Sequence, residues 1–231
     1  MIVHIVLKQF QSKSTRLSSS FAFAGCGWLV PFHLGVIKKM QEKGVLTNDS
    51  IAAGTSGGSL AALVAVNDIA PEKALEYIIH NSTDKSFRGN IDIKLKLFLK
   101  RVIPHDALQR SNGRLYVCVS RIWPKPRNQP VIISQYESID NILSVIAASC
   151  FIPLYSHSRR IATKISVPSG SNNSNSSNSS ATGSGADAVA KFYVDGGLHA
   201  WMPPIGKCTN HTHVLRCYMS IVVYTLLTLY S

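Results

Sequence analysis

Hydrophobic and polar positions in the first part of the chain alternate between short apolar strands and amphipathic helices. Residues 18–24 alternate into an apolar strand that stops at Gly25, and residues 31–44 carry an apolar stripe at helical spacing. Pro31 suits the first turn of this helix, and Gly44 is a typical C-terminal stop. The pattern predicts a strand followed directly by a helix.

The same order is repeated further along the chain. Residues 51–53 are a short apolar run, residues 60–66 form a fully apolar helical segment, and another helix starts at Pro71. Strands that alternate with helices are typical of a parallel sheet covered by helices. The chain has 231 residues and is 45% hydrophobic, which is enough for one well-buried core. We therefore predict one α/β domain.

Residues 91–103 fit two periods, because their apolar positions match both a strand and one face of a helix. Their Leu and Lys content favours the helix. Such a helix is basic and amphipathic, as interfacial helices are, but an ordinary surface helix with solvated lysines has the same pattern. Its basic residues are Lys94, Lys96, Lys100 and Arg101.

The second half of the chain predicts more strands around a polar insertion. Strands are expected at 114–120 and 131–134, which pair like a hairpin, and at 191–194, with a helix at 138–149. Residues 168–186 are nearly all Ser, Asn and Gly. Such a segment cannot bury enough apolar surface to offset ordering, so it predicts a disordered insertion in a surface loop.

The charge of the chain is strongly positive and unevenly placed. The formal net charge is +12, no acid precedes Glu42 and none follows Asp195. A basic surface favours an anionic partner, either a lipid surface or a nucleic acid. Neither zinc-finger spacing nor an aromatic-rich RNP-type strand accompanies the charge, so we favour an anionic membrane surface over nucleic acid.

Cysteine usage and the N-terminal segment bear on the compartment. The five cysteines are scattered and form no CxxC pair, which favours free thiols in a reducing compartment such as the cytoplasm. Residues 1–10 lack the basic-then-apolar order of a signal peptide. The acid-free first twenty residues suit a transit peptide or, as we favour, a short lead-in to the first strand. The cysteines are Cys26, Cys118, Cys150, Cys208 and Cys217.

A serine between glycines lies where the second strand is expected to turn into a helix. Residues 54–58, Gly-Thr-Ser-Gly-Gly, match G-x-S-x-G in the strand–turn–helix setting of a nucleophile elbow. A Cβ at Gly54 or Gly58 is expected to collide with the neighbouring strand and helix. The helix N-terminus favours negative charge beside Ser56. Ser56 is therefore a candidate nucleophile.

A serine nucleophile needs hydrogen-bond donors for the oxyanion that forms on attack. Gly25, Cys26 and Gly27 lie between the first strand and the following helix, where backbone N–H groups are free and directed by the helix end. A plain strand-to-helix turn is the alternative interpretation of these residues.

The nucleophile also needs a base, and Asp195 is the candidate. A carboxylate at a strand end, followed by Gly196 and Gly197, can approach another loop closely, although a simple Asp-Gly turn has the same sequence. A Ser-His-Asp triad is a further alternative. The histidines after Asp195 are His199, His211 and His213, while His33 and His80 lie on expected helices, where core or surface roles are more common.

Three blocks of sequence resemble, in order and spacing, the blocks of the patatin-like phospholipase family. Two stretches between them are also similar to its animal acylglycerol-lipase branch. The resemblance covers roughly residues 19–204. The three blocks are residues 23–36, 54–58 and 195–197, and the two stretches are residues 103–115 and 148–153.

This resemblance implies a three-layer α/β/α fold with a mainly parallel central sheet and a Ser-Asp dyad rather than a triad. Ser56 would attack an ester carbonyl, and Asp195 would accept its proton and assist the water that deacylates the enzyme. Backbone N–H groups of Gly25, Cys26 and Gly27 would hold the oxyanion. The resemblance implies no metal and no organic cofactor. The implied substrates are fatty-acyl esters of phospholipids or acylglycerols in a membrane or lipid droplet, with which a cytoplasmic protein associates peripherally.

Two departures from the family pattern motivate an alternative. Val30, followed by Pro31, stands where the glycine-rich loop usually has its last glycine, so the oxyanion hole could be misplaced. Residues 198–204 replace the Asn-x-Pro that usually follows the Asp-Gly-Gly block. The alternative is a catalytically weak, lipid-binding member of the same fold.

The expected organisation is a lead-in at 1–17, a catalytic domain at 18–213 and an apolar tail at 214–231. The tail is short for a membrane span and is interrupted by Arg216, so a last buried strand or two, or an abnormal C-terminus, are the interpretations we favour.

Overall fold

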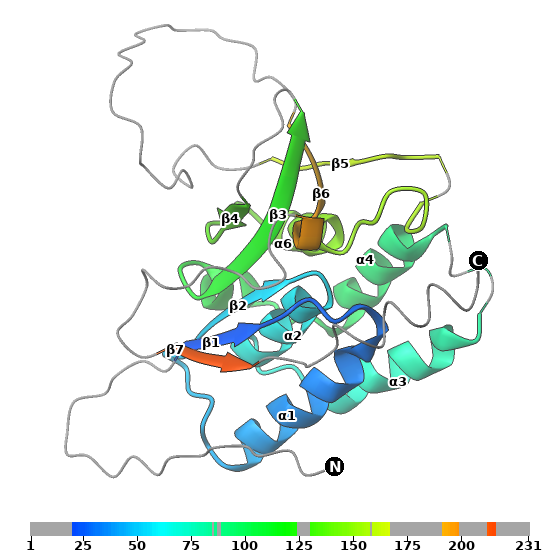
Figure 1. Ribbon diagram of the computed structural model, residues 1–231. Helices are drawn as coiled ribbons and strands as arrows, with labels where there is room; N and C mark the ends of the chain where they lie inside the picture. Colours follow the sequence, from blue (N-terminus) through cyan, green and yellow to red (C-terminus); the bar gives the residue numbers. More distant parts are fainter. Residues whose placement is uncertain are drawn as a thin grey trace, which may run out of the picture.

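The computed structural model describes residues 20–84, 86, 89–123, 130–157, 159–166, 191–198 and 212–215 (Figure 1). The strands are β1 (Ser20–Phe23), β2 (Ile51–Thr55), β3 (Leu115–Trp123), β4 (Val131–Ile133), β5 (Thr163–Lys164), β6 (Phe192–Asp195) and β7 (Thr212–Leu215). The α-helices are α1 (Val30–Glu42), α2 (Gly57–Val66), α3 (Pro71–Ser82), α4 (Ile91–Val102), α5 (Ala107–Ser111) and α6 (Ile139–Ser149). Short 3-10 helices are formed by η1 (Gly27–Leu29) and η3 (Gly196–Leu198).

The described strands form one mixed sheet in the order β5-β6-β3-β2-β1-β7, with β4 paired to β3 beside that path. Strand β1 is parallel to β2 and β7, and β2 is parallel to β3. The pairs β3–β4, β3–β6 and β5–β6 are antiparallel. The parallel strands β1 and β2 each lead into a helix, so both chain turns lie at the same edge of the sheet, where α/β proteins place their sites.

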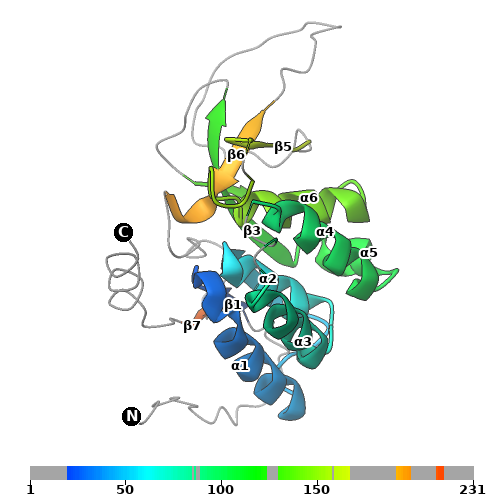
Figure 2. The same cartoon turned by 90° about the vertical axis from the view of Figure 1, so that its right-hand side faces the viewer.

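The six α-helices of the described residues lie on one side of the sheet (Figure 2). Helix α2 packs on β1, β2 and β3, α6 packs on β3 and β6, and α1 and α4 lie against α2 and α6 respectively. A small cluster of Ala22, Ala53 and Tyr116 lies apart from the main core. The α/β architecture is confirmed, but a second helical layer, which a three-layer fold includes, is not among the described elements.

The core lies between the sheet and this helical layer. Helix α2 is apolar on nearly all sides, which suits its position between the sheet and the outer helices. Complete burial of one large aliphatic or aromatic side chain contributes about 1.5–3 kcal/mol to the free energy of folding. The largest fully buried apolar side chains include Phe23, Leu34, Ile37, Leu63, Ile142, Ile146, Phe151 and Tyr193.

Residues Ile91–Val102 form the helix α4, so the helical prediction for this ambiguous segment is correct. Leu95 and Leu99, one turn apart, are buried in the core, whereas Leu97 is 56% exposed. Two of the basic side chains of this helix form ion pairs. Lys94 pairs with Asp84, and Lys100 pairs with Asp140.

Several predictions concern residues outside the described ranges. These are the lead-in at 1–17, the insertion at 168–186 and most of the tail. Strand β7 (Thr212–Leu215) crosses the expected boundary between the domain and the tail.

Candidate active site

Ser56 lies in a sharp turn between β2 and α2, with φ of 53° and ψ of −131°. Residues other than glycine rarely adopt positive φ, and such strain is found mainly at functional sites. Two glycines make the turn possible sterically. A Cβ at Gly54 would lie 2.1 Å from the carbonyl oxygen of Gly58, and a Cβ at Gly58 would lie 2.3 Å from that of Phe23. Strand, turn and helix therefore pack backbone to backbone around Ser56.

Both backbone polar groups of Ser56 are held by other serines. Its N–H donates to Ser149 Oγ at 2.9 Å, and that hydroxyl donates to the Cys118 carbonyl at 2.7 Å. Its carbonyl accepts hydrogen bonds from Ser59 N at 2.8 Å and Ser59 Oγ at 2.6 Å. These bonds fix a strained backbone conformation, because hydrogen bonds to buried groups are costly to leave unmade. The sequence motifs did not point to either serine, although Ser149 is in one of the family-like stretches.

Ser56 Oγ donates a hydrogen bond to Asp195 Oδ2 at 2.7 Å. Strand pairing explains how residues so far apart in the chain meet. Thr55 of β2 pairs with Cys118 of β3, and Asp195 of β6 pairs with the next residue of β3, Val119. The ends of β2 and β6 therefore lie level on either side of β3.

The carboxylate of Asp195 is oriented by its own turn. Its Oδ1 accepts the Gly197 N–H at 2.7 Å, and its backbone N–H donates to the Phe151 carbonyl at 2.9 Å. A Cβ at Gly196 would lie 2.3 Å from the Cys118 carbonyl oxygen, so this position also requires a glycine. The Asp-Gly-Gly sequence thus forms a tight turn that directs one carboxylate oxygen at Ser56.

Asp195 is 7% exposed, and burial raises the pKa of its carboxyl group, partly offset by the hydrogen bonds from Ser56 and Gly197. Burial disfavours the charged form of a carboxyl group, which makes the ionised group a better proton acceptor. A carboxyl group with a shifted pKa, hydrogen-bonded to a strained serine at a helix N-terminus, has the features of an acid–base pair.

Among the three residues of the candidate donor loop, Gly27 is the one that lines the same cavity as Ser56. Gly25 and Cys26 are buried, and Gly27 has φ of +52°, a conformation that favours glycine. The loop packs on the elbow, since a Cβ at Gly57 would lie 2.8 Å from Cys26 Sγ.

Val30 has φ of −45° and ψ of −37°, which is ordinary helical backbone. Valine adopts this conformation without the strain that would require glycine. Its side chain is buried and approaches Gly57, where an added Cβ would lie 2.8 Å from Val30 Cγ2. The local backbone therefore accommodates valine at position 30, where the family usually has a glycine.

His33 is fully buried beneath the donor loop rather than beside Ser56. Its Nε2 donates to the Ala24 carbonyl at 3.1 Å, and its ring meets Phe23 edge-on at 5.5 Å. Burial lowers the pKa of His33, which favours the neutral ring. His80 is exposed on α3. His199, His211 and the side chain of His213 lie outside the described residues, so the described partner of Ser56 Oγ is a carboxylate.

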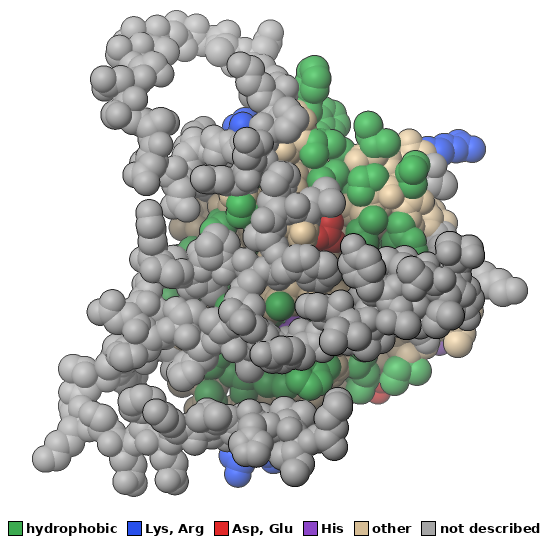
Figure 3. Space-filling model, in the orientation of Figure 1, with side chains coloured by type: hydrophobic (Ala, Val, Ile, Leu, Met, Phe, Trp, Pro, Cys, Tyr) green, Lys and Arg blue, Asp and Glu red, His purple; other side chains and the backbone are tan. Residues whose placement is uncertain are grey.

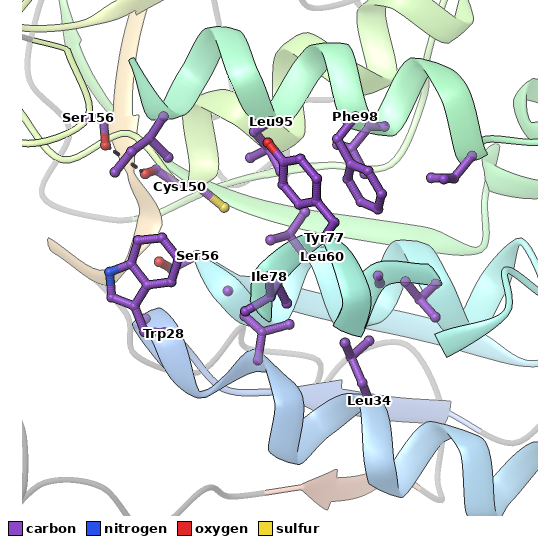
Figure 4. A pocket seen from close by; sticks show the side chains of 18 of the residues that line it. Trp28, Leu34, Ser56, Leu60, Tyr77, Ile78, Leu95, Phe98, Cys150 and Ser156 are labelled. Carbon is purple, nitrogen blue, oxygen red and sulfur yellow. Dashed lines mark hydrogen bonds between the residues drawn. The ribbon is translucent and has the colours of Figure 1, made fainter. Parts of the chain in front are cut away.

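An apolar cavity extends from Ser56 between α2, α3 and α4 (Figure 4). Trp28 lies beside Ser56 at one end, and its indole N–H donates to the Tyr155 hydroxyl at 2.8 Å. Tyr77 lies near the middle of this view with Phe98 beside it. Side chains along the cavity are almost all aliphatic or aromatic, and they include Leu60, Val64, Ile78, Leu95 and Leu99.

Three free thiols surround this site. Cys26 packs on the elbow, Cys150 Sγ lies 3.8 Å from Ser59 Oγ, and Cys118 is buried on β3. Burial raises the pKa of Cys118 to about 11 and the pKa of Cys150 still further. In the described part of the chain, no three His, Cys, Asp or Glu side chains gather in a way that could hold a metal ion.

The fold and the site together define an α/β protein with a serine elbow beside an apolar cavity. A family model described as patatin-like phospholipase matches residues 21–205. The chain therefore belongs to the patatin-like phospholipase family, as the sequence blocks predicted.

Curated relatives share a similar stretch of sequence. The chain is 31% identical over 146 residues to mouse patatin-like phospholipase domain-containing protein 2, covering 59% of the chain and 29% of that protein. It is 27% identical over 146 residues to human omega-hydroxyceramide transacylase, covering 59% of the chain and 27% of the transacylase. It is 27% identical over 148 residues to human 1-acylglycerol-3-phosphate O-acyltransferase PNPLA3, covering 59% and 30%. The matched stretch is thus less than a third of each of these relatives.

Among solved structures, VipD from Legionella pneumophila superposes with a TM-score of 0.48 at 13% identity, covering 85% of this chain and 49% of that one.

Proposed function

We propose that the protein is a lipid acyl hydrolase that cleaves fatty-acyl esters of phospholipids or acylglycerols through a Ser56–Asp195 dyad. The observation that carries this proposal is the 2.7 Å hydrogen bond from Ser56 Oγ to Asp195 Oδ2. It joins a strained serine, at the end of an apolar cavity, to a buried carboxyl group with a raised pKa. Apolar lining suits a fatty-acyl chain, and membership of a lipid-modifying family supports the same substrate class.

In the proposed first half-reaction, Ser56 Oγ attacks the ester carbonyl carbon while its proton passes to Asp195. A bond forms between Oγ and this carbon, and the carbonyl oxygen becomes an oxyanion. Collapse of this intermediate breaks the bond to the alcohol oxygen, which leaves with the proton from Asp195. The acyl group remains as an ester of Ser56.

In the second half-reaction, Asp195 accepts a proton from a water that attacks the acyl-enzyme. The bond between the acyl carbon and Ser56 Oγ breaks, Oγ takes the proton back, and the fatty acid departs. An alcohol in place of water would give acyl transfer by the same steps. Two of the relatives are named as a transacylase and an acyltransferase, so both acceptors belong in an activity screen.

The oxyanion requires donors that are in place before the reaction. The Gly27 N–H and the N-terminus of α2 are the groups that we assign to it, because both border the cavity at Ser56. Each such donor contributes about 10²–10³-fold to the rate. The helical backbone at Val30 supports a working site and weakens the case for a catalytically weak, lipid-binding member.

A fluorophosphonate probe tests the proposal directly. This electrophile reacts with activated serines, so the wild-type protein should be labelled at Ser56 and should lose ester hydrolysis in proportion to labelling. Peptide mass spectrometry of the labelled protein identifies the modified serine. A catalytically weak, lipid-binding protein would resist the probe while still binding lipid vesicles, and that result would overturn the proposed activity.

We further propose that residues 152–161 contact the lipid surface. Ile152 and Tyr155 border the cavity, and the neighbouring Leu154 is 73% exposed. Arg159 follows in the same segment and favours anionic headgroups, whereas Arg160 pairs with the buried carboxylate of Asp92 at 3.2 Å. Hydrophobic side chains gather on the face shown in Figure 3, over the end of the molecule that holds β3, β5 and β6. None of the helices in the described part of the chain is both long and apolar enough to cross a bilayer.

Flotation with vesicles of mixed neutral and anionic phospholipids measures this contact. Leu154→Asp is expected to reduce the vesicle-bound fraction, and aspartate tolerates the positive φ of 65° at this position. The matched control is Ile79→Asp, because Ile79 is 61% exposed on α3 and lies outside this segment. Equal loss of binding in both variants would argue against residues 152–161 as the contact.

A further inference from the structure

The end of helix α6 holds both members of the proposed dyad by their backbone. Ser149, the last residue of α6, accepts the Ser56 N–H at 2.9 Å. Two residues further on, the Phe151 carbonyl accepts the Asp195 N–H at 2.9 Å. Ser56 follows β2 and Asp195 ends β6, and these strands are separated by β3 in the sheet. Residues 149–151 therefore connect the two functional residues through one short stretch of backbone.

The hydroxyl of Ser149 is itself fixed by a second hydrogen bond. It donates to the Cys118 carbonyl of β3 at 2.7 Å, and Ser149 is fully buried. Gly196 packs against the same carbonyl, because a Cβ at Gly196 would lie 2.3 Å from its oxygen. The Cys118 carbonyl is thus a common contact of Ser149 and of the turn that follows Asp195.

The elbow needs such a support because the backbone of Ser56 is strained. Positive φ is unfavourable for serine, and strained conformations persist only where the surrounding structure over-determines them. The bonds from Ser59 to the Ser56 carbonyl lie within the first turn of α2, so they move together with the elbow. The bond to Ser149 comes from a different helix. It therefore fixes the elbow relative to β3 and to Asp195.

We propose that Ser149 is a positioning residue that holds Ser56 Oγ within reach of Asp195 for attack on the ester. This inference rests on the proposed function, because it takes Ser56 as the nucleophile. Ser149 is not among the residues that line the cavity, and its proton is already donated to Cys118, so it acts through Ser56 and not on the substrate. Loss of its hydroxyl would leave the Ser56 N–H and the Cys118 carbonyl unpaired. The elbow would then relax from the 2.7 Å contact with Asp195.

Ser149→Ala should lower kcat and leave KM near its wild-type value. A displacement of about 1 Å in a reacting group can cost roughly 10²-fold in rate, so we expect kcat to fall by up to about 10²-fold. KM should persist because the residues that line the cavity are unchanged. Ester hydrolysis over a range of substrate concentrations separates the two parameters. Ser149→Thr keeps the hydroxyl and should restore most of kcat.

The matched control is Ser50→Ala. Ser50 is 2% exposed, and its hydroxyl accepts the Thr47 N–H at 2.9 Å and bonds to Thr47 Oγ1. It precedes β2, at the opposite end of this strand from Ser56. Both substitutions therefore remove the hydrogen bonds of a buried serine hydroxyl, but only one of them is beside the dyad. A kcat as low in Ser50→Ala as in Ser149→Ala would indicate a general structural effect and would overturn the inference.

The acid limb of kcat/KM is a readout that a loss of stability alone would not move. Burial raises the pKa of Asp195, and the hydrogen bond from Ser56 lowers it. A weaker bond should therefore raise this pKa further and shift the acid limb of Ser149→Ala to higher pH. The thiols of Cys118 and Cys150 also interact with Asp195, but burial raises the pKa of both, so they stay neutral in this range. An acid limb at the wild-type pH in Ser149→Ala would contradict the inference.

A further variant keeps the test decisive if Ser149→Ala unfolds. Ser149→Cys is close to the wild type in shape, but a thiol is a weak donor and a weak acceptor. Its kcat should therefore fall below that of the wild type and of Ser149→Thr. A wild-type kcat in folded Ser149→Cys would also overturn the inference.

Amide hydrogen exchange separates this inference from the proposed function, because it requires no catalysis. Peptides that contain residues 54–59 should exchange faster in Ser149→Ala than in the wild type and in Ser50→Ala, since the Ser56 N–H loses its acceptor. Faster exchange in this variant, with no ester hydrolysis by the wild type, would refute the hydrolase and leave Ser149 as the support of Ser56. Hydrolysis by the wild type, with unchanged kcat in Ser149→Ala, would refute the positioning role alone.

Discussion

Ser56→Ala is expected to abolish ester hydrolysis, with kcat falling by at least about 10⁴-fold. The substitution removes the only atom of this residue that can form the acyl-enzyme, and no hydroxyl then donates to Asp195 Oδ2 from this position. Binding of fatty acids should persist, because the apolar cavity is unchanged. The measurement is the hydrolysis rate of acylglycerol and phospholipid esters, compared with fatty-acid binding by the same preparation.

The fold should survive this substitution. Alanine has the same backbone preferences as serine at φ of 53°, and the hydrogen bonds of the Ser56 backbone to Ser149 and Ser59 do not involve Oγ. Ser144→Ala is the matched control, since Ser144 lies on α6 and accepts a hydrogen bond from Lys96. Substantial hydrolysis by Ser56→Ala, at the level of this control, would exclude Ser56 as the nucleophile.

Asp195→Asn is expected to lower kcat by roughly 10²–10⁴-fold, the usual contribution of a general base. Asparagine has nearly the same shape and can still accept the Gly197 N–H, but it cannot take the proton of Ser56. The matched control is Asp140→Asn on α6, whose carboxylate is exposed and pairs with Lys100. Full activity in Asp195→Asn would show that another group removes the proton.

The pH dependence of kcat/KM, measured for the wild type and for Asp195→Asn, checks the assignment of Asp195 as the base. The base must be ionised, and burial raises the pKa of Asp195 above 3.8. The acid limb of kcat/KM in the wild type should therefore have its midpoint above 3.8, and it should be absent from any residual activity of Asp195→Asn.

The raised pKa of Asp195 also predicts how the free energy of unfolding of the wild type and of Asp195→Asn changes with pH. A carboxyl group whose folded pKa exceeds its unfolded pKa stabilises the fold fully at low pH and loses that contribution as pH rises through the folded pKa. The variant lacks this loss. Its free energy of unfolding should therefore fall less than that of the wild type as pH rises through this range, which thermal unfolding over a pH series can measure.

Local patterns predicted much of the fold because they reflect local physics. The glycines at 54 and 58, the proline in the first turn of α1 and the apolar run of α2 each specify a backbone geometry within a few residues. The segment at 91–103 was ambiguous by period, and packing of Leu95 and Leu99 into the core resolved it as a helix. The antiparallel placement of β6 beside β3 depends on contacts across the whole chain, which periodicity does not encode.

The motifs of the candidate site could be predicted from the sequence, but the residues that hold the Ser56 backbone in place could not. Ser56 and Asp195 stand in recognisable sequence blocks, whereas Ser149 and Ser59 support the site through hydrogen bonds to the Ser56 backbone, which no motif predicts. The importance of a glycine at position 30 could not be judged without its φ angle. The stacking of Tyr77 on Phe98 likewise arises from the approach of two helices, and neither residue belongs to a motif.

Burial of the thiols around Ser56 has a consequence for chemical inhibition. A thiol with a pKa of about 11, as at Cys118, is ionised in only about one molecule in 10⁴ at neutral pH, and Cys150 is ionised still less. Thiolates are the nucleophiles that attack haloacetamides and maleimides. These two cysteines are therefore protected from such reagents, and an electrophile delivered through the cavity can be made selective for serine.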